Sequence, residues 1–170
     1  MVIEKRWNKT VSSQNKMEVQ LPVLKLPAPV FRIISGSGQS SKIFDTIRRK
    51  YVLLTPEEWV RQHLLHYLIN EKKFPLSLIA VEKSVKVNGL PRRTDVLVYN
   101  SKLEKILLAE CKAPSVKITQ AVFDQAARYN MTLDVKCFVL TNGLETYCCT
   151  MDHELKKYVF LKEVPLFTEI

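Results

Sequence analysis

An acidic and a basic residue, Glu110 and Lys112, lie two positions apart near the middle of the chain, a spacing that brings their side chains together in a strand. In "ILLAECKAPS", residues 106–115, an apolar run ends in Glu110 and Lys112 shortly before a proline. Side chains alternate along a strand, so Glu110 and Lys112 share one face and Cys111 lies on the other. Both faces are apolar up to this point, which is typical of a central strand covered on both sides. Because ionised groups are seldom buried without a partner, this strand end indicates a partly buried site.

The preceding segment offers a second carboxylate. In "RTDVLVYN", residues 93–100, Asp95 begins an apolar run. A hairpin about residues 101–103 brings Asp95 opposite roughly Ala109 or Glu110. The two carboxylates must then share a proton, meet a cation, or lie further apart than this register implies. A hard divalent ion such as Mg²⁺ suits two carboxylates that leave positions for water and a phosphate oxygen. Lys112 would orient the attacking water or offset charge on the phosphate.

The elements around these residues predict an α/β domain. "TPEEWVRQHLLHYLINE" (55–71) predicts a helix with Thr55 as N-cap and Pro56 at its first position. "SLIAVEKSVKV" (77–87), "RTDVLVYN" and "EKILLAECK" (104–112) predict three strands, and the pattern over 115–133 predicts a second helix. Two strands within 135–152 flank Asn142-Gly143, a hairpin signal, and a final strand is expected over 157–161. The order predicts a central mixed sheet flanked by helices.

Length and charge restrict the class of protein. A chain of 170 residues is expected to form one main domain, and its net charge of +9 favours an anionic partner. We expect nucleic acid rather than a membrane surface, since no basic amphipathic helix stands out. No apolar run approaches the roughly 18 residues of a membrane span, and the N-terminus lacks a signal-peptide core. We therefore expect a soluble, cytoplasmic protein.

The first 44 residues differ from the rest. "LPVLKLPAPVFRI" (21–33) contains three prolines, which favour extended backbone. "SGSGQSSK" (35–42) lacks the Gly-Lys-Ser/Thr ending of a Walker loop, so a flexible linker is the better interpretation. We expect residues 1–44 to form an extended or flexible arm and residues 45–170 to form the main domain.

Histidines and cysteines give no clear second metal site. His63 and His66 lie three positions apart on the first predicted helix and could reach one ion, but without a third ligand solvated or core histidines are favoured. The cysteines lie in apolar strand-like segments without Cys-x-x-Cys spacing, which predicts reduced core thiols. They are Cys111, Cys137, Cys148 and Cys149.

Asp95 followed by Glu110-Cys111-Lys112, in this order of elements, resembles the PD-(D/E)xK nuclease superfamily with its D…ExK signature. The closer resemblance is to the N-terminal nuclease domain of type I restriction enzyme R subunits, in its compact stand-alone branch. It covers roughly residues 45–145, and Thr94 stands where the older signature has proline. No Walker loop or helicase motor follows, so we expect that this chain does not translocate DNA. The stretches that carry the resemblance are "TPEEWVRQHLLHYLI", "AVEKSVKVNGLPRRTDVLVY", "ILLAECKAPSVKITQAVFDQAARYN" and "VLTNG".

The resemblance implies a restriction-endonuclease-like fold over residues 45–170, with an αβββαβ core, and a Mg²⁺-dependent DNA endonuclease in which Mn²⁺ can replace Mg²⁺. Asp95 and Glu110 would be metal ligands, the Cys111 backbone carbonyl a third, and Lys112 the catalytic lysine. A first-helix glutamate often joins the metal site, and Glu58 is preferred to its neighbour Glu57. The remaining assignments are Gln125 in support of the site and, as DNA contacts, Arg92, Arg93, Lys117 and Tyr129.

Two other functions stay open. A non-cutting nucleic-acid-binding or regulatory module would keep the fold and its charged pocket. A structural subunit of a larger restriction assembly would act only with its partner subunits. Cutting both DNA strands would favour a homodimer.

Overall fold

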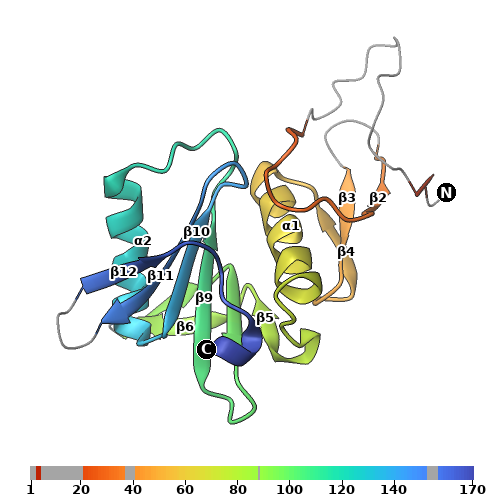
Figure 1. Cartoon of the computed structure of the whole chain (residues 1–170). Coiled ribbons are helices and arrows are strands. Elements are labelled where there is room, and N and C mark those ends of the chain that lie inside the picture. Colours follow the sequence, from red (N-terminus) through yellow and green to blue (C-terminus); the bar gives the residue numbers. More distant parts are fainter. Residues whose placement is uncertain (1–2, 5–20, 37–40, 88, 153–156) are drawn as a thin grey trace.

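A six-stranded mixed sheet forms the centre of the structure (Figure 1). The computed structural model describes residues 3–4, 21–36, 41–87, 89–152 and 157–170. β9 and β10 are parallel, and the other neighbours are antiparallel. The sheet has helix α1 on one face and helix α2 on the other, which confirms the predicted sheet flanked by helices. The strand order is β12 (Lys157–Leu161), β11 (Thr146–Asp152), β10 (Cys137–Thr141), β9 (Lys105–Cys111), β8 (Val96–Tyr99) and β5 (Ile79–Val81).

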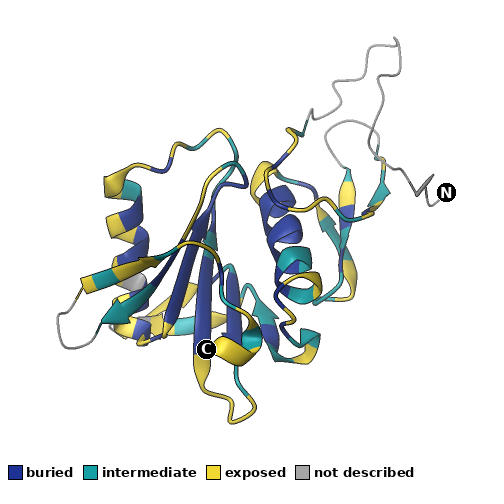
Figure 2. Ribbon diagram, viewed as in Figure 1, coloured by how far each residue is buried: buried dark blue, intermediate teal, exposed yellow. Residues whose placement is uncertain are grey.

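Helix α1 (Pro56–Asn70) begins where the sequence predicts. The Thr55 hydroxyl accepts a hydrogen bond from the Glu58 backbone N–H at 3.0 Å, which satisfies one of the free donors at a helix N-terminus. Val60, Leu64 and Leu68 are fully buried. Buried residues occur around most of the helix, because it lies between two sheets (Figure 2).

The second sheet packs on the far side of α1 (Figure 1). It is antiparallel, in the order β1 (Ile3–Glu4), β2 (Arg32–Ile34), β3 (Lys42–Asp45) and β4 (Lys50–Leu53). Leu24, Phe31 and Ile43 are buried in the same apolar cluster as α1. The boundary placed after residue 44 falls inside β3 and stays a prediction. Residues 37–40 of the expected linker lie outside the described residues.

Helix α2 (Gln120–Leu133) covers the opposite face of the six-stranded sheet. The helix expected over 115–133 starts only at Gln120, because the Thr119 hydroxyl accepts from the Val122 N–H and caps it there. Residue Ile118 is buried against α2 although it precedes the helix. The two faces carry separate apolar clusters, with Cys148 in the α1 cluster and Cys149 in the α2 cluster.

The predicted strand over 77–87 is wrong as one element. It divides into β5, in the main sheet, and β6 (Ser84–Val87), which pairs with β7 (Leu90–Arg93) in a separate hairpin. The break lies at Glu82, whose φ of 54° is left-handed and ends the extended strand. Along the chain, α1 is therefore followed by the main-sheet strands β5, β8 and β9, then by α2 and by strand β10 of the same sheet.

The Asn142-Gly143 hairpin is confirmed. β10 and β11 pair antiparallel up to Thr141 and Thr146, and Gly143 has a φ of 83° that glycine adopts without strain. The Asn142 side-chain oxygen accepts from the backbone N–H groups of residues 144 and 145, at 2.9 and 2.7 Å. The predicted reduced core thiols are also confirmed, since all four cysteines are free and buried.

Two short 3-10 helices, Leu76–Leu78 and Phe167–Glu169, complete the secondary structure of the described ranges. None of the helices found there combines the length and apolar character that a membrane span needs.

His63 of α1 is a core residue. It is 2% exposed, its ring lies 4.1 Å from that of Trp59 and 4.7 Å from that of Phe31, and its Nδ1 lies 2.9 Å from the Trp59 carbonyl oxygen. The pKa of His63 is lowered from 6.5 to about 4, mainly by burial and to a smaller extent by the charge of His66, against an opposing effect of the Trp59 carbonyl. The imidazole is therefore neutral in the folded protein near pH 7.

Replacing His63 by Gln should remove part of the acid sensitivity of folding. In the unfolded chain the imidazole takes up a proton near pH 6.5, but in the folded chain only near pH 4, so stability is present above pH 6.5 and is lost as the pH falls. Between pH 7 and pH 5, protonation of His63 in the unfolded chain lowers the free energy of unfolding of the wild type by about 2 kcal/mol. Urea titrations of both proteins at pH 7 and pH 5 measure this loss. Equal acid-induced losses in wild type and His63→Gln would contradict the assignment.

Candidate metal and phosphate site

The β8–β9 register brings Asp95 and Glu110 side by side. Val96 pairs with Ala109, so Asp95, one residue earlier, comes level with Glu110, as the hairpin predicts. The Asp95 carboxylate is held in place by the Cys111 backbone N–H, which donates to its Oδ2 at 2.7 Å. A carboxylate at the start of one strand is thus bonded to the end of the next strand.

Glu110 and Lys112 form an ion pair at the end of β9. Lys112 Nζ donates to Glu110 Oε1 at 2.8 Å, and the side chains are 30% and 31% exposed. Burial and then the charge of Asp95 raise the pKa of Glu110, and the opposing effects of Lys112 and Arg61 are smaller. Burial lowers the pKa of Lys112, but Glu110 and Asp95 raise it by more. The two carboxylates therefore interact, and the lysine is positively charged.

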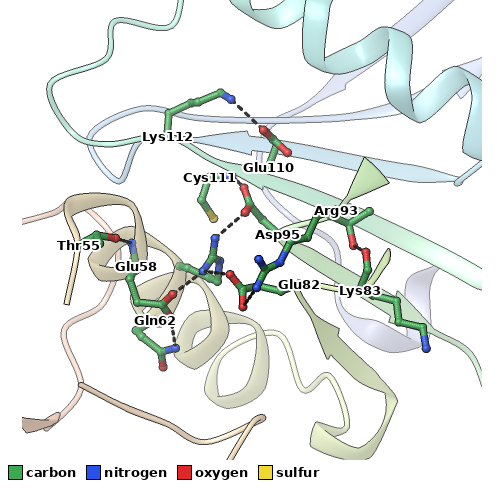
Figure 3. Close-up of polar contacts among 12 residues, drawn as sticks. Thr55, Glu58, Gln62, Glu82, Lys83, Arg93, Asp95, Glu110, Cys111 and Lys112 are labelled. Atoms are coloured by element: carbon green, nitrogen blue, oxygen red, sulfur yellow. Dashed lines mark hydrogen bonds and ion pairs between the residues drawn. The ribbon is translucent and has the colours of Figure 1, made fainter. Parts of the chain in front are cut away.

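A guanidinium group lies on the other side of Asp95. Arg61 Nη2 donates to Asp95 Oδ1 at 2.6 Å, and its Nη1 contacts Glu58 and lies 3.7 Å from Glu82 Oε1. Burial lowers the pKa of Arg61, but the charges of Asp95 and Glu58 raise it by more, so the side chain stays ionised. Figure 3 shows Glu58, Glu82 and Asp95 facing this region, with Glu110 and Lys112 beyond Asp95.

A second guanidinium group extends the network to the small sheet. Arg48, in the β3–β4 turn, bonds Asp45 Oδ2 at 2.6 Å and both Glu58 Oε1 and Glu82 Oε2 at 2.5 Å. Gln62 Nε2 donates to Asp45 and Glu58 at 2.8 Å each. Together with Arg61, these contacts form what we call the arginine network: Asp45, Arg48, Glu58, Arg61, Gln62, Glu82 and Asp95.

Most of the arginine network was not predicted from the sequence. Asp95 and Glu58 were expected at the site, but Arg48, Arg61 and Glu82 were not. The local signals were the spacings of Glu58 with Arg61 and Gln62, three and four apart on a helix, and of Asp45 with Arg48, three apart in the chain. Arg48 and Glu82 come from a turn and a strand end that no sequence pattern connects with α1.

A pocket of about 270 Å³ opens on the α2 side of the strand end. Glu110, Lys112 and Gln125 line it, together with Arg92 and Arg93 of β7. The structure thus brings these five predicted site residues to one cavity. Lys117 is exposed in the β9–α2 connection and is not among the lining residues. The side chain of Tyr129 lies outside the described part of the structure.

The donor set at this strand end fits a hard divalent cation. Asp95 and Glu110 offer carboxylate oxygens, which match an ion that keeps water in its other positions. Within the described ranges, no cluster of three or more His, Cys, Asp and Glu side chains is arranged to hold a metal. Glu58 bonds Arg48, Arg61 and Gln62, and Glu57 is exposed, with a charge that contributes to the raised pKa of Lys112.

Comparisons with known proteins identify the family. A solved fragment of a protein assigned as the HsdR subunit of a type I restriction enzyme from Vibrio vulnificus YJ016 is 20% identical, with a TM-score of 0.48. The match covers 66% of this chain and only 24% of that chain. No curated protein matches. The family described as "Type I restriction enzyme R protein N terminus (HSDR_N)" matches residues 56–165, well over half of the sequence. The chain therefore belongs to the family of type I restriction enzyme R protein N-terminal regions.

Proposed function

We propose that this chain is a Mg²⁺-dependent DNA endonuclease of the PD-(D/E)xK type, with a restriction-endonuclease-like fold. The observation that carries the proposal is the juxtaposition of Asp95 and Glu110, with Lys112 bonded to Glu110, at the end of a buried central strand. Burial and the neighbouring Asp95 carboxylate raise the pKa of Glu110, which calls for a cation at this point, and a lysine beside it suits the chemistry of phosphodiester hydrolysis. Membership of a restriction enzyme family supports the same reaction class.

The proposed roles follow from these positions. Asp95, Glu110 and the Cys111 carbonyl hold Mg²⁺ or Mn²⁺, and Glu58 is the candidate for a further ligand. When bound, the ion neutralises charge on the phosphate and makes its water a better nucleophile. Lys112 donates a hydrogen bond to the attacking water or to a phosphate oxygen, and its positive charge offsets the negative charge that develops there. Gln125, across the pocket on α2, orients the phosphate group.

Two of the proposed DNA contacts, Arg92 and Arg93, line the same pocket. The other two are Lys117, which is exposed in the β9–α2 connection, and Tyr129, which belongs to α2. Such contacts bind the phosphate backbone without reading sequence. Arg93 also pairs with Glu82, so DNA would compete with that carboxylate for the guanidinium group. The net charge of +9 supports a polyanionic substrate.

We propose that the partners are DNA and other restriction-modification subunits, with a homodimer for cutting both strands. The family is named for one part of a multi-subunit enzyme, and this chain matches only 24% of the HsdR chain from Vibrio vulnificus.

One observation favours a second candidate, a non-cutting DNA-binding module. Both carboxylate oxygens of Asp95 already accept hydrogen bonds from groups of this chain, Arg61 and the Cys111 N–H. With Asp95 neutralised in this way, the neighbouring pocket with Arg92, Arg93 and Lys112 would bind a phosphate without metal. The two candidates differ in their dependence on divalent ions.

Mn²⁺ binding tests the proposed metal ligands directly. Calorimetric titration of the 170-residue chain with Mn²⁺ should show a site that Asp95→Asn and Glu110→Gln each weaken by at least about tenfold, because each removes a charged ligand. Glu104→Gln, in the β8–β9 loop of the same hairpin, is the control and should bind as wild type does. Equal Mn²⁺ affinity in all four proteins would contradict the metal site.

The rate of DNA cutting tests the proposed role of Lys112. Lys112→Met should slow Mg²⁺-dependent nicking of plasmid DNA by at least about 100-fold, because it removes a positive charge aimed at the reacting phosphate. Its Mn²⁺ affinity should not fall by more than a few-fold. Lys105→Met, at the exposed far end of the same strand, should cut at the wild-type rate. Retention of DNA binding without metal, with no scission by wild type under any condition, would instead favour the non-cutting module.

A further inference from the structure

Arg61 lies between Asp95 and Glu58, where a divalent ion bound by both carboxylates would have to lie. Its guanidinium bonds Asp95 Oδ1 at 2.6 Å and also contacts Glu58, the two carboxylates assigned to the metal from opposite walls of the site. The side chain is 9% exposed, so little water screens its charge. A divalent ion bound to Asp95 would lie close to this positive charge and be repelled by it.

Arg61 is not required to orient Asp95. The Cys111 N–H holds Oδ2 at 2.7 Å independently of the arginine. Nor is Arg61 the only positive charge on the other acids, because Arg48 bonds both Glu58 and Glu82. Removing the Arg61 charge would therefore leave Asp95 in position and make its surroundings more negative. This predicts a gain in affinity for a divalent ion, whereas a purely structural role for Arg61 predicts a loss.

An alternative position for the guanidinium is already present. Arg61 Nη1 lies 3.7 Å from Glu82 Oε1, further than a direct hydrogen bond but within reach of a small shift of the side chain. Glu82 is 25% exposed. Figure 3 shows it on the other side of Asp95 from the Glu110–Lys112 pair. Movement toward Glu82 would keep Arg61 paired while freeing Asp95 Oδ1.

We propose that Arg61 is a built-in competitor of the metal: it neutralises Asp95 in the metal-free protein and must move toward Glu82 for a divalent ion to bind. The inference rests on the metal site of the proposed function and adds the residue that limits its affinity. The free protein then binds divalent ions weakly, and anything that draws Arg61 away from Asp95 strengthens the metal site.

The test compares Mn²⁺ affinities by calorimetry in the full chain. Arg61→Gln should bind Mn²⁺ at least about tenfold more tightly than wild type, because a repelling charge beside the ion is gone. Arg48→Gln is the matched control: it removes the other guanidinium of the arginine network, which has no bond to Asp95, and should change the affinity less than about threefold. The double variant Arg61→Gln/Asp95→Asn should lose the gain.

The outcomes separate this inference from the proposed function. Wild-type binding that depends on Asp95 but is not strengthened in Arg61→Gln would overturn the inference and leave the metal site standing. No Mn²⁺ binding in any variant would overturn both. If Arg61→Gln does not fold, Arg61→Met replaces it, since methionine also lacks the charge but keeps a long unbranched side chain that fills the buried space. Arg61→Met should also bind more tightly than wild type, and an unchanged or weaker affinity would overturn the inference.

Discussion

Four carboxylates meet between α1 and the ends of β5 and β8, and they can stay there only because arginines neutralise them. Asp45 is fully buried and Glu58 is 5% exposed, so neither is stabilised by bulk water. Arg48 and Arg61 supply the compensating charge through bonds that cross from the small sheet to α1 and from α1 to the main sheet. Removal of one partner from such a buried pair typically costs about 3–5 kcal/mol. The arginine network is therefore a structural joint as well as the neighbour of the candidate site.

The candidate site depends on this joint through Asp95. One oxygen of Asp95 belongs to the arginine network, while the strand that follows brings Glu110 level with it. Glu110 and Lys112 turn the other way, into the pocket beneath α2. The strand end thus separates a closed, neutralised side from an open, partly exposed side. A phosphate would enter from the open side, where Arg92 and Arg93 also lie. Arg61 neutralises Asp95 on the closed side, and Lys112 pairs with Glu110 on the open side.

Features set by neighbouring residues were predictable from the sequence. Thr55 and Pro56 define the start of α1, the continuous apolar run before Glu110 predicts β9, and a short connection between two strands sets the register of Asp95 against Glu110. These predictions held because each depends on backbone rules acting over a few positions.

Features that depend on distant residues were not predictable. Arg61 and Asp95 are 34 positions apart, as are Arg48 and Glu82, and no periodicity links them. The left-handed backbone at Glu82, which divides β5 from β6, is rare for glutamate and has no composition signal. The start of α2 was placed too early because Ile118 continues the apolar spacing in front of the Thr119 cap.

The position of a bound ion would show whether Asp95 and Glu110 hold one metal and whether Arg61 leaves Asp95 when they do. Crystals of the wild-type chain grown with Mn²⁺ and measured at a wavelength where manganese scatters anomalously would locate it. We expect an anomalous peak bounded by carboxylate oxygens of Asp95 and Glu110 and by the Cys111 carbonyl, with Arg61 withdrawn from Asp95 toward Glu82. An intact Arg61–Asp95 pair with no peak beside Glu110, at saturating Mn²⁺, would contradict this expectation.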